Sequence, residues 1–283
     1  MQFEYARPTS VQQACNMLEE QKEATLLAGG QSLLPLLREK AVSYDYVIDI
    51  TQLSEREYIR LEDDQIRIGC LTRHVEVVES ETVQKHCPVL AEAVGQIGDL
   101  QVRNRGTICG SLAHADPSGD PPLIAVLLDA EIHTRSPDET TTYSARSFYT
   151  DAHSTELNRN EIITEARFPV VDSDQGVAYN KWHPSEVAYA VASAGVSVEI
   201  EESHITNATI VTGAIEPTPK LRPSVANQLI GAQPTEQTLN QAAIAVAENC
   251  DPVEDFEGSK LFKKEMIKTL VKKSLTEAVE KVK

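Results

Sequence analysis

Two glycine-containing turns are the residues whose types and spacing could bind a ligand. The first, AGGQS at 28–32, follows a short apolar run and precedes a predicted helix. Glycine allows positive φ and close approach of a backbone to a ligand, and the N–H groups at a helix start suit a phosphate. A Gly-Gly turn is more often simply a turn. Since this one matches neither GxGxxG nor GxxxxGK[ST], any nucleotide would be bound in another way.

The second turn, TICGS at 107–111, belongs to a polar, glycine-rich stretch over 98–122. We predict a long ordered loop there, and such a loop inside a compact domain is usually functional. Arg103 and Arg105 could offset the charge of a ligand phosphate. The simpler alternative for either arginine is an ion pair with a neighbouring carboxylate such as Asp99.

No set of side chains predicts catalysis by the protein itself. The sequence contains neither a G-x-S-x-G elbow nor HExxH,. A metal site built from His114, Asp116 and Asp120 can be imagined, but their spacing matches no standard motif, and we predict no metal and no catalytic side chain. A sequence with two glycine turns and no such constellation points to a cofactor that does the chemistry.

The five cysteines are scattered and form no CxxC pair. This pattern argues against a disulfide framework and against a zinc or iron–sulfur site within the chain. We expect small buried hydrophobic residues in a reducing compartment. If iron–sulfur clusters serve this protein, another chain carries them.

Composition excludes some functions. The formal charge is −17, from 43 acidic and 26 basic residues, which argues against nucleic-acid binding. The acidic excess indicates either a well-solvated surface or adaptation to high salt. No apolar run is long enough for a transmembrane helix, and MQFEYARPTS does not resemble a secretory signal,. We therefore expect a cytoplasmic protein, or one held at the inner side of a membrane through partners.

The elements that must position the two turns follow from hydrophobic periodicity. The first segment predicts a compact βαβ unit around AGGQS: a helix over 10–21 with Ser10 as N-cap, a strand over 25–27, a helix over 33–40 capped by Ser32, and a strand over 44–50. The middle predicts α+β structure, with strands over 65–70, 130–136 and 161–171 and helices over 72–80, 88–97 and 123–128.

After a polar connection at 172–176, three consecutive strands are predicted over 177–182, 190–200 and 205–215, and 202–204 would turn the second into the third. Three helices follow, over 223–230, 236–249 and 259–282. The last has one apolar face that includes Leu261, Leu270 and Leu275. We expect this helix to pack on its own sheet, with a role in subunit contact as the lesser alternative.

These residues resemble a known family. AGGQSLLPLL, then VIDI, then QVRNRGTICGSLAHADPSGD, is similar to the FAD-binding medium subunit of the xanthine dehydrogenase and carbon monoxide dehydrogenase family. The resemblance extends to IGCLTRH at 68–74, EIITEARFP at 161–169 and the C-terminal tail, and so spans nearly the whole chain. The pair of turns, with RNRGTI leading the second, is the specific signal.

The resemblance implies an α+β fold. A PCMH-like FAD-binding domain of two subdomains would be followed by a domain with a three-stranded antiparallel sheet and helices. The implied boundaries are 1–174 for the FAD-binding domain, with subdomains of about 1–57 and 58–174, and 175–283 for the C-terminal domain. The order of predicted elements agrees with this plan.

The resemblance also implies how FAD would be bound. The pyrophosphate would be held from one side by Ala28, Gly29, Gly30, Gln31 and Ser32, and from the other by Thr107, Ile108, Cys109, Gly110 and Ser111. The flavin region would be lined by Gly98, Asp99, Leu100, Gln101 and Val102. Asp120 would hydrogen-bond the cofactor, and Lys181 and Tyr189 would come from the C-terminal domain, the tyrosine near the isoalloxazine ring.

Two departures from the family pattern stand out. The family's second turn usually reads T-I-G-G, and Cys109 takes the place of the first of those glycines. If that position needs φ > 0, the cysteine carries a strain of roughly 1 kcal/mol. The family also often has an acidic residue just before the aromatic, where this chain has Ala188.

By resemblance, the chain is the FAD-carrying electron-transfer subunit of a molybdenum hydroxylase. Its partners would be a molybdopterin-binding large subunit and a [2Fe–2S] small subunit, assembled as a dimer of heterotrimers. Electrons would pass from the clusters through FAD to an external acceptor. One alternative is a self-sufficient FAD-dependent oxidase or dehydrogenase, which would need its own substrate pocket and base. The other is a non-enzymatic assembly subunit that has lost FAD, an idea that only Cys109 encourages.

Overall fold

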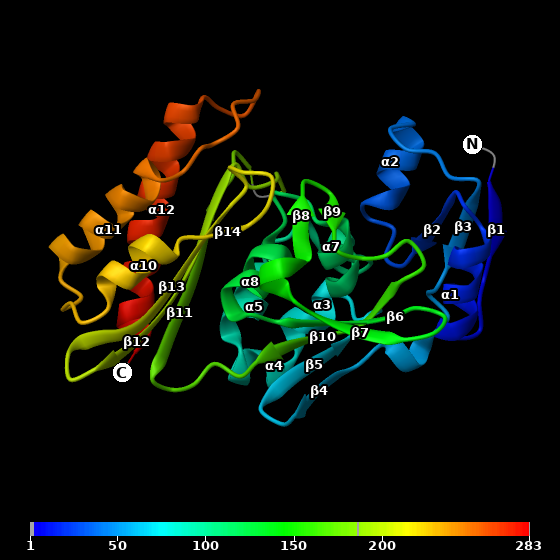
Figure 1. The fold of residues 1–283 in the computed structure, drawn as a ribbon, viewed down its shortest axis with the longest axis horizontal. Coiled ribbons are helices and arrows are strands. Elements are labelled where there is room, and N and C mark those ends of the chain that lie inside the picture. Colours follow the sequence, from blue (N-terminus) through cyan, green and yellow to red (C-terminus); the bar gives the residue numbers. More distant parts are fainter. Residues whose placement is uncertain (1–2, 186, 283) are drawn as a thin grey trace.

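The computed structural model describes residues 3–185 and 187–282. Figure 1 shows three parts in a row: an N-terminal unit in blue, a central block in cyan and green, and a C-terminal sheet covered by helices in yellow to red. This α+β arrangement agrees with the predicted class.

The N-terminal unit is built on a small parallel sheet. Its strand order is β1 (Glu4–Ala6), β3 (Tyr46–Asp49), β2 (Ala24–Leu27), and it carries helices α1 (Val11–Glu20) and α2 (Leu33–Glu39). The parallel pairing of β2 with β3 around α2 confirms the predicted βαβ unit. Strand β1 was not predicted, because three half-exposed residues carry no alternation.

The caps of these two helices differ. Ser10 accepts a hydrogen bond from the amide of Gln13 at 3.1 Å, which confirms the predicted N-cap of α1. The prediction that Ser32 caps α2 was wrong, since its side chain makes no capping bond. Ser32 already has helical backbone angles, φ −100° and ψ −49°, whereas a capping side chain acts from an extended residue.

The central block has a five-stranded antiparallel sheet. The strand order is β4 (Ile59–Glu62), β5 (Gln65–Gly69), β10 (Ile162–Pro169), β6 (Glu131–Arg135), β7 (Thr140–Ser144). Its helices and short elements are η1 (Ser54–Arg56), α3 (His74–Glu79), α4 (Glu81–His86), α5 (Pro88–Val94), α9 (Ala145–Phe148), β8 (Tyr149–Asp151) and β9 (Ser154–Thr155). These strands and helices agree with the α+β structure predicted for the middle of the chain.

Helix α8 (Asp120–Leu128) joins the central block to the C-terminal sheet. All of its residues are buried, as expected of a helix that is apolar all round. It contacts α5 and α7 (Ile108–His114) in the central block, and strands β12 (Ala192–Glu201) and β13 (His204–Gly213) of the C-terminal sheet. Gly195 and Gly213 make room for it, because a Cβ at either would lie under 3.0 Å from Leu123.

The stretch 98–122 is not the long loop that we predicted. It contains α6 (Leu100–Arg103), α7 (Ile108–His114) and the start of α8. Side chains cap the first two helices: Asp99 accepts from the Val102 amide and Thr107 accepts from the Gly110 amide. The many glycines suggested a loop, but Gly98, Gly106 and Gly119 lie between helices and Gly110 lies inside one.

The C-terminal sheet has four antiparallel strands, so the expectation of three was wrong. They are β11 (Gln175–Trp182), β12 (Ala192–Glu201), β13 (His204–Gly213) and β14 (Lys220–Leu221), in that order. Strand β14 pairs with β13 through Val211 and Thr212. Two residues in a proline-rich stretch are too few to show an alternating pattern. The predicted turn over 202–204 is present, with Glu202 and Ser203 at positive φ.

Helices α10 (Pro223–Leu229), α11 (Glu236–Glu248) and α12 (Lys260–Lys281) cover one face of this sheet (Figure 1). Helix α12 packs on β11 and β12, which confirms the predicted docking. A Cβ at Gly176 would lie 1.9 Å from the carbonyl oxygen of Ala278, so the backbones touch. The predicted apolar face is wrong at Leu261, which is 72% exposed, while Lys263 is buried and pairs with Asp255.

All five cysteines are buried and free, as expected. Burial raises the pKa of the Cys15 thiol to about 11 and those of Cys70 and Cys87 to about 12. These thiols stay protonated and unreactive at neutral pH. Within the described residues, no helix combines the length and the apolar character needed to cross a lipid bilayer.

Candidate functional site

The two glycine turns lie against each other. A Cβ at Gly29 would sit 2.1 Å from the carbonyl oxygen of Arg105 and 2.7 Å from the Cα of Gly106. Only glycine allows this approach of the backbone of the first turn to the residues just before the second. Gly30 follows at φ +74°, a conformation that side chains rarely adopt,. The fold therefore brings the half-buried AGGQS turn against Arg105 and Gly106, the two residues that lead into TICGS.

The first turn leads directly into α2. The carbonyl oxygen of Gly30 accepts from the amide of Leu34 at 3.1 Å, and the side-chain amide of Gln31 lies 3.5 Å from the carbonyl oxygen of Gly29. Ala28 packs against the central hydrophobic core. Such a turn can offer backbone N–H donors, which suit a pyrophosphate in an acidic protein because they bind an anion without a cationic side chain.

The second turn is held to the central block by backbone bonds. The amide of Ile108 donates to the carbonyl oxygen of Thr72 at 3.1 Å, and the amide of His74 donates to that of Gly106 at 2.9 Å. Thr107 caps α7 through its hydroxyl. These contacts fix the start of the second turn to the segment around Thr72 and His74.

The expectation of strain at Cys109 was wrong. Cys109 is helical, within α7, and is not among the residues with positive φ. Its side chain is 3% exposed and belongs to the core. Burial raises the pKa of its thiol well above the ordinary value, so the cysteine acts as a small apolar core residue. Without backbone strain at Cys109, the structure gives no reason to expect that the chain has lost FAD.

His74 is a residue of this site that motif analysis did not single out. It is 2% exposed, and its Nε2 lies 3.1 Å from the Ser111 hydroxyl. A Cβ at Gly106 would meet its ring at 2.9 Å. Burial, followed by the nearby Arg103 charge, lowers the pKa of His74 to about 4. A neutral imidazole therefore packs against the second turn. The only sequence feature that could have indicated this residue is its position in the family segment IGCLTRH.

Asp120 and Lys181 form a buried ion pair between the two domains. Lys181 Nζ lies 2.7 Å from Asp120 Oδ2 and donates to the carbonyl oxygen of Gln96 at 2.9 Å. Tyr179 donates to the other carboxylate oxygen. Burial raises the pKa of Asp120, and the attraction of Lys181 opposes that rise. The two residues that resemblance placed at the cofactor are thus in contact.

The residues expected to line the flavin region begin two positions after Gln96, whose carbonyl oxygen accepts from Lys181. Gly98 turns at φ +46°, and Asp99 to Val102 form the start of α6. Arg103 donates to the carbonyl oxygens of Ile97 and Gly98 at 2.8 and 3.0 Å, so its predicted pairing with Asp99 was wrong. Leu100 and Tyr189 are 60% and 62% exposed, and such exposed apolar surface is available to a ligand.

The imagined group of His114, Asp116 and Asp120 does not come together. Asp120 is committed to Lys181 and Tyr179. In its place, the fold brings His153 to the other two, and the ligand atoms of His114, Asp116 and His153 all lie within 4.8 Å of one another. Burial lowers the pKa of His114.

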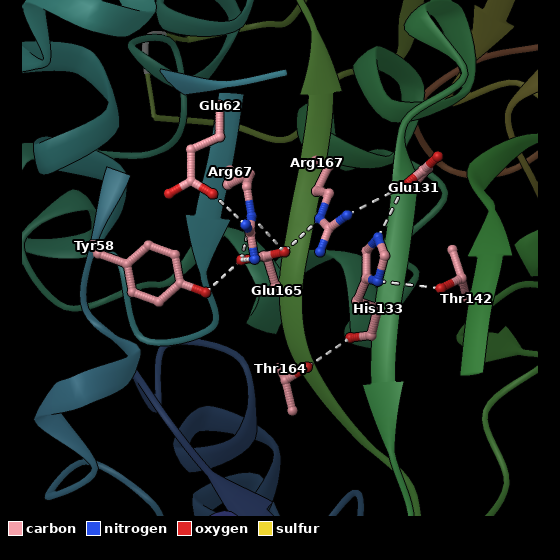
Figure 2. A network of polar contacts seen from close by, with 9 residues as sticks. All are labelled: Tyr58, Glu62, Arg67, Glu131, His133, Thr142, Thr164, Glu165 and Arg167. Carbon is pink, nitrogen blue, oxygen red and sulfur yellow. Dashed lines mark hydrogen bonds and ion pairs between the residues drawn. The ribbon is translucent and has the colours of Figure 1, made fainter. Parts of the chain in front are cut away.

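The motif EIITEARFP serves the five-stranded sheet. Figure 2 shows the carboxylate of Glu165, on β10, accepting hydrogen bonds from the Tyr58 hydroxyl and from the guanidinium groups of Arg67 and Arg167. Burial opposes ionisation of Glu165, but the three donors outweigh it and lower the pKa of the carboxyl group. His133 and Glu131 form a neighbouring pair at 2.9 Å (Figure 2). This network ties the strands together.

Comparisons with known proteins agree with this architecture. A family described as "FAD binding domain in molybdopterin dehydrogenase" matches residues 1–171. A second, described as "CO dehydrogenase flavoprotein C-terminal domain", matches residues 177–278. The chain belongs to the family of FAD-binding subunits of molybdopterin dehydrogenases.

Individual relatives match over nearly their whole length. The chain is 31% identical to the glyceraldehyde dehydrogenase medium chain of Sulfolobus acidocaldarius, covering 98% of each chain. It is 33% identical to the carbon monoxide dehydrogenase medium chain of Hydrogenophaga pseudoflava, covering 98% of this chain and 96% of that one. A solved carbon monoxide dehydrogenase from the same organism superposes with a TM-score of 0.97 at 32% identity, covering 100% and 99%.

Proposed function

We propose that this chain binds one FAD across the two contacting glycine turns and passes electrons through it within a molybdenum-containing dehydrogenase. The contact of Gly29 with Arg105 and Gly106 carries the proposal, because it brings the backbone of the first turn to the residues that lead into the second. When bound, FAD supplies the redox chemistry, and the protein binds, orients and shields it.

The proposed pyrophosphate site comprises Ala28 to Ser32 and Thr107 to Ser111. The flavin side comprises Gly98 to Val102, the Asp120–Lys181 pair and Tyr189. The pair supports this role because a buried lysine held 2.7 Å from a carboxylate keeps a fixed charge at the domain boundary. We place that boundary between an FAD-binding domain over 1–174, with subdomains of about 1–57 and 58–174, and a C-terminal domain over 175–283.

The proposed partners are a molybdopterin-binding large subunit and a [2Fe–2S] small subunit, in a dimer of heterotrimers. Matched relatives are named as medium chains of dehydrogenases, which supports a multi-subunit assembly. Electrons would reach FAD from the small subunit and leave for an external acceptor. The large subunit would set the substrate.

The test compares two valine substitutions at glycines of like conformation. Gly30 has φ +74° in the first turn, while Gly231 has φ +80° with no atom near its missing Cβ. Both variants bear similar backbone strain, but a Cβ at Gly30 would also lie 2.9 Å from Leu34 Cδ1, the end of a flexible side chain,. We expect Gly30→Val to abolish flavin absorbance in the folded protein and Gly231→Val to keep it. Full flavin content in Gly30→Val would overturn the pyrophosphate assignment.

Co-expression with its neighbouring genes separates the alternatives. Flavin together with two co-purifying chains supports the proposed subunit. A flavoprotein that turns over a substrate alone would instead be a self-sufficient oxidase or dehydrogenase. A folded chain that assembles with partners but never retains FAD would be an assembly subunit.

A further inference from the structure

Two histidines and an aspartate converge where the end of α7 meets the β8–β9 hairpin. His114 is the last residue of α7, Asp116 follows it by two residues, and His153 lies in the turn between β8 and β9. Figure 1 shows where α7 and this hairpin lie in the fold. Nε2 of His114 lies 3.8 Å from Oδ2 of Asp116, and the two imidazole rings are 4.7 Å apart. No part of the proposed flavin site uses these three side chains.

The backbone holds the two segments together. The amide of His153 donates to the carbonyl oxygen of Ala115 at 2.9 Å. Both residues have positive φ, 55° and 50°, so each chain segment turns sharply at the contact. The convergence of the side chains is therefore built into the fold.

Hydrogen bonds also fix the tautomer of His153 and the orientation of the Asp116 carboxylate. Nδ1 of His153 lies 3.2 Å from the carbonyl oxygen of His114. A carbonyl only accepts, so Nδ1 carries the proton and Nε2 carries the lone pair, which is the usual arrangement of a metal-binding histidine. Oδ1 of Asp116 accepts from the Ser118 amide at 2.9 Å, and this bond orients the carboxylate.

We propose that His114, Asp116 and His153 bind one divalent transition-metal ion, best matched by Zn²⁺. Two imidazoles and a carboxylate suit zinc and its neighbours rather than Mg²⁺ or Ca²⁺, which prefer oxygen ligands. Bonds of about 2.0–2.2 Å place ligands of a tetrahedral ion about 3.3 Å apart. Starting within 4.8 Å, the ligand atoms reach that spacing by small movements, chiefly of the exposed His153.

Charge favours a cation here. The site holds one carboxylate and two imidazoles in a chain of net charge −17, and such a field raises the local concentration of cations. Three protein ligands leave the fourth position of the ion open to water or a ligand. The ion would join α7, which begins at the second glycine turn, to the β8–β9 hairpin.

The experiment titrates chelator-treated, full-length protein with Zn²⁺ by calorimetry and with Co²⁺ by visible absorption. We expect one ion per chain. His114→Asn and His153→Asn should each weaken binding by at least about tenfold, a loss seen even when a supporting partner of a metal ligand is removed. Asparagine tolerates the positive φ of His153, so the second variant keeps the turn.

His133→Asn is the matched control. His133 also pairs with a carboxylate, Glu131, but has no second histidine in that pair. We expect its affinity to equal that of the unmodified protein. The proposal fails if no saturable binding of one ion occurs, if the two site variants bind as tightly as the parent, or if the control weakens binding equally. Should His114→Asn perturb α7 in circular dichroism, His153→Asn alone decides.

Discussion

Gly29 and Arg105, far apart in the sequence, meet backbone to backbone, with 2.1 Å between a Cβ added at Gly29 and the carbonyl oxygen of Arg105. The contact brings the first glycine turn against the residues that lead into the second. It also means that the smallest possible side chain at Gly29 would force them apart.

Gly29→Ala should therefore weaken FAD binding and lower the free energy of unfolding by about 1–3 kcal/mol, as overpacking does. Gly176→Ala is the control, because its Cβ would clash similarly with Ala278 in the C-terminal domain. We expect a comparable loss of stability there with unchanged FAD affinity. Fluorescence titration with FAD and urea unfolding measure both effects. Equal FAD affinity in Gly29→Ala and the parent would contradict the role of the contact.

Cys109→Gly tests the helical placement of this residue. The substitution should lower the unfolding free energy by about 1 kcal/mol for glycine in a helix, plus the cost of the emptied core volume. FAD affinity should stay unchanged. Cys109→Ala separates the two terms, because it removes the thiol but keeps the helix propensity. A more stable Cys109→Gly protein would revive the idea that the cysteine is strained.

Sequence patterns predicted most elements because burial imposes a period on them. The alternating strands β5 and β10 and the amphipathic α11 and α12 lie close to their predicted bounds. A close backbone contact at a glycine produces no periodic pattern in the sequence. The packing of Gly29 on Arg105 therefore could not be predicted. His153 joined His114 for a similar reason: a hairpin contact across distant segments has no local signature.

Lys181→Met should be strongly destabilising. It leaves Asp120 buried without its counter-charge, and breaking a buried pair typically costs about 3–5 kcal/mol. Asp120→Asn with Lys181→Met should recover part of that loss, since no buried charge remains. In Lys181→Met the remaining carboxyl is neutralised by protonation, so the deficit should shrink between pH 7 and pH 5 in urea unfolding. A single variant as stable as the parent would show that the pair is not buried in solution.

His74 gives the protein a defined response to acid. Its folded-state pKa, about 4, lies below the ordinary 6.5 because burial penalises the charged form. The unfolded chain binds the proton more readily, so the stability contribution is complete above pH 6.5 and is lost as the pH falls toward 4. The full loss is about 3 kcal/mol. His74→Gln should show a flatter decline in unfolding free energy over this window, and parallel declines would refute the assignment.

Salt dependence distinguishes the two explanations of the acidic composition. If the −17 charge reflects a high-salt environment, repulsion among carboxylates should destabilise the fold at low ionic strength, where the Debye length is about 30 Å at 0.01 M. Molar salt shortens that length to about 3 Å and should raise the melting temperature.

Bound FAD should survive the same titration, because short-range contacts with half-buried turns are screened less than exposed ion pairs. The measurement is the melting temperature and bound-flavin fraction from near-zero to several molar potassium chloride. A melting temperature that stays flat or falls indicates an ordinary solvated acidic surface. Flavin released by salt while the fold melts higher would mean that exposed arginines such as Arg105, rather than backbone amides, hold the pyrophosphate.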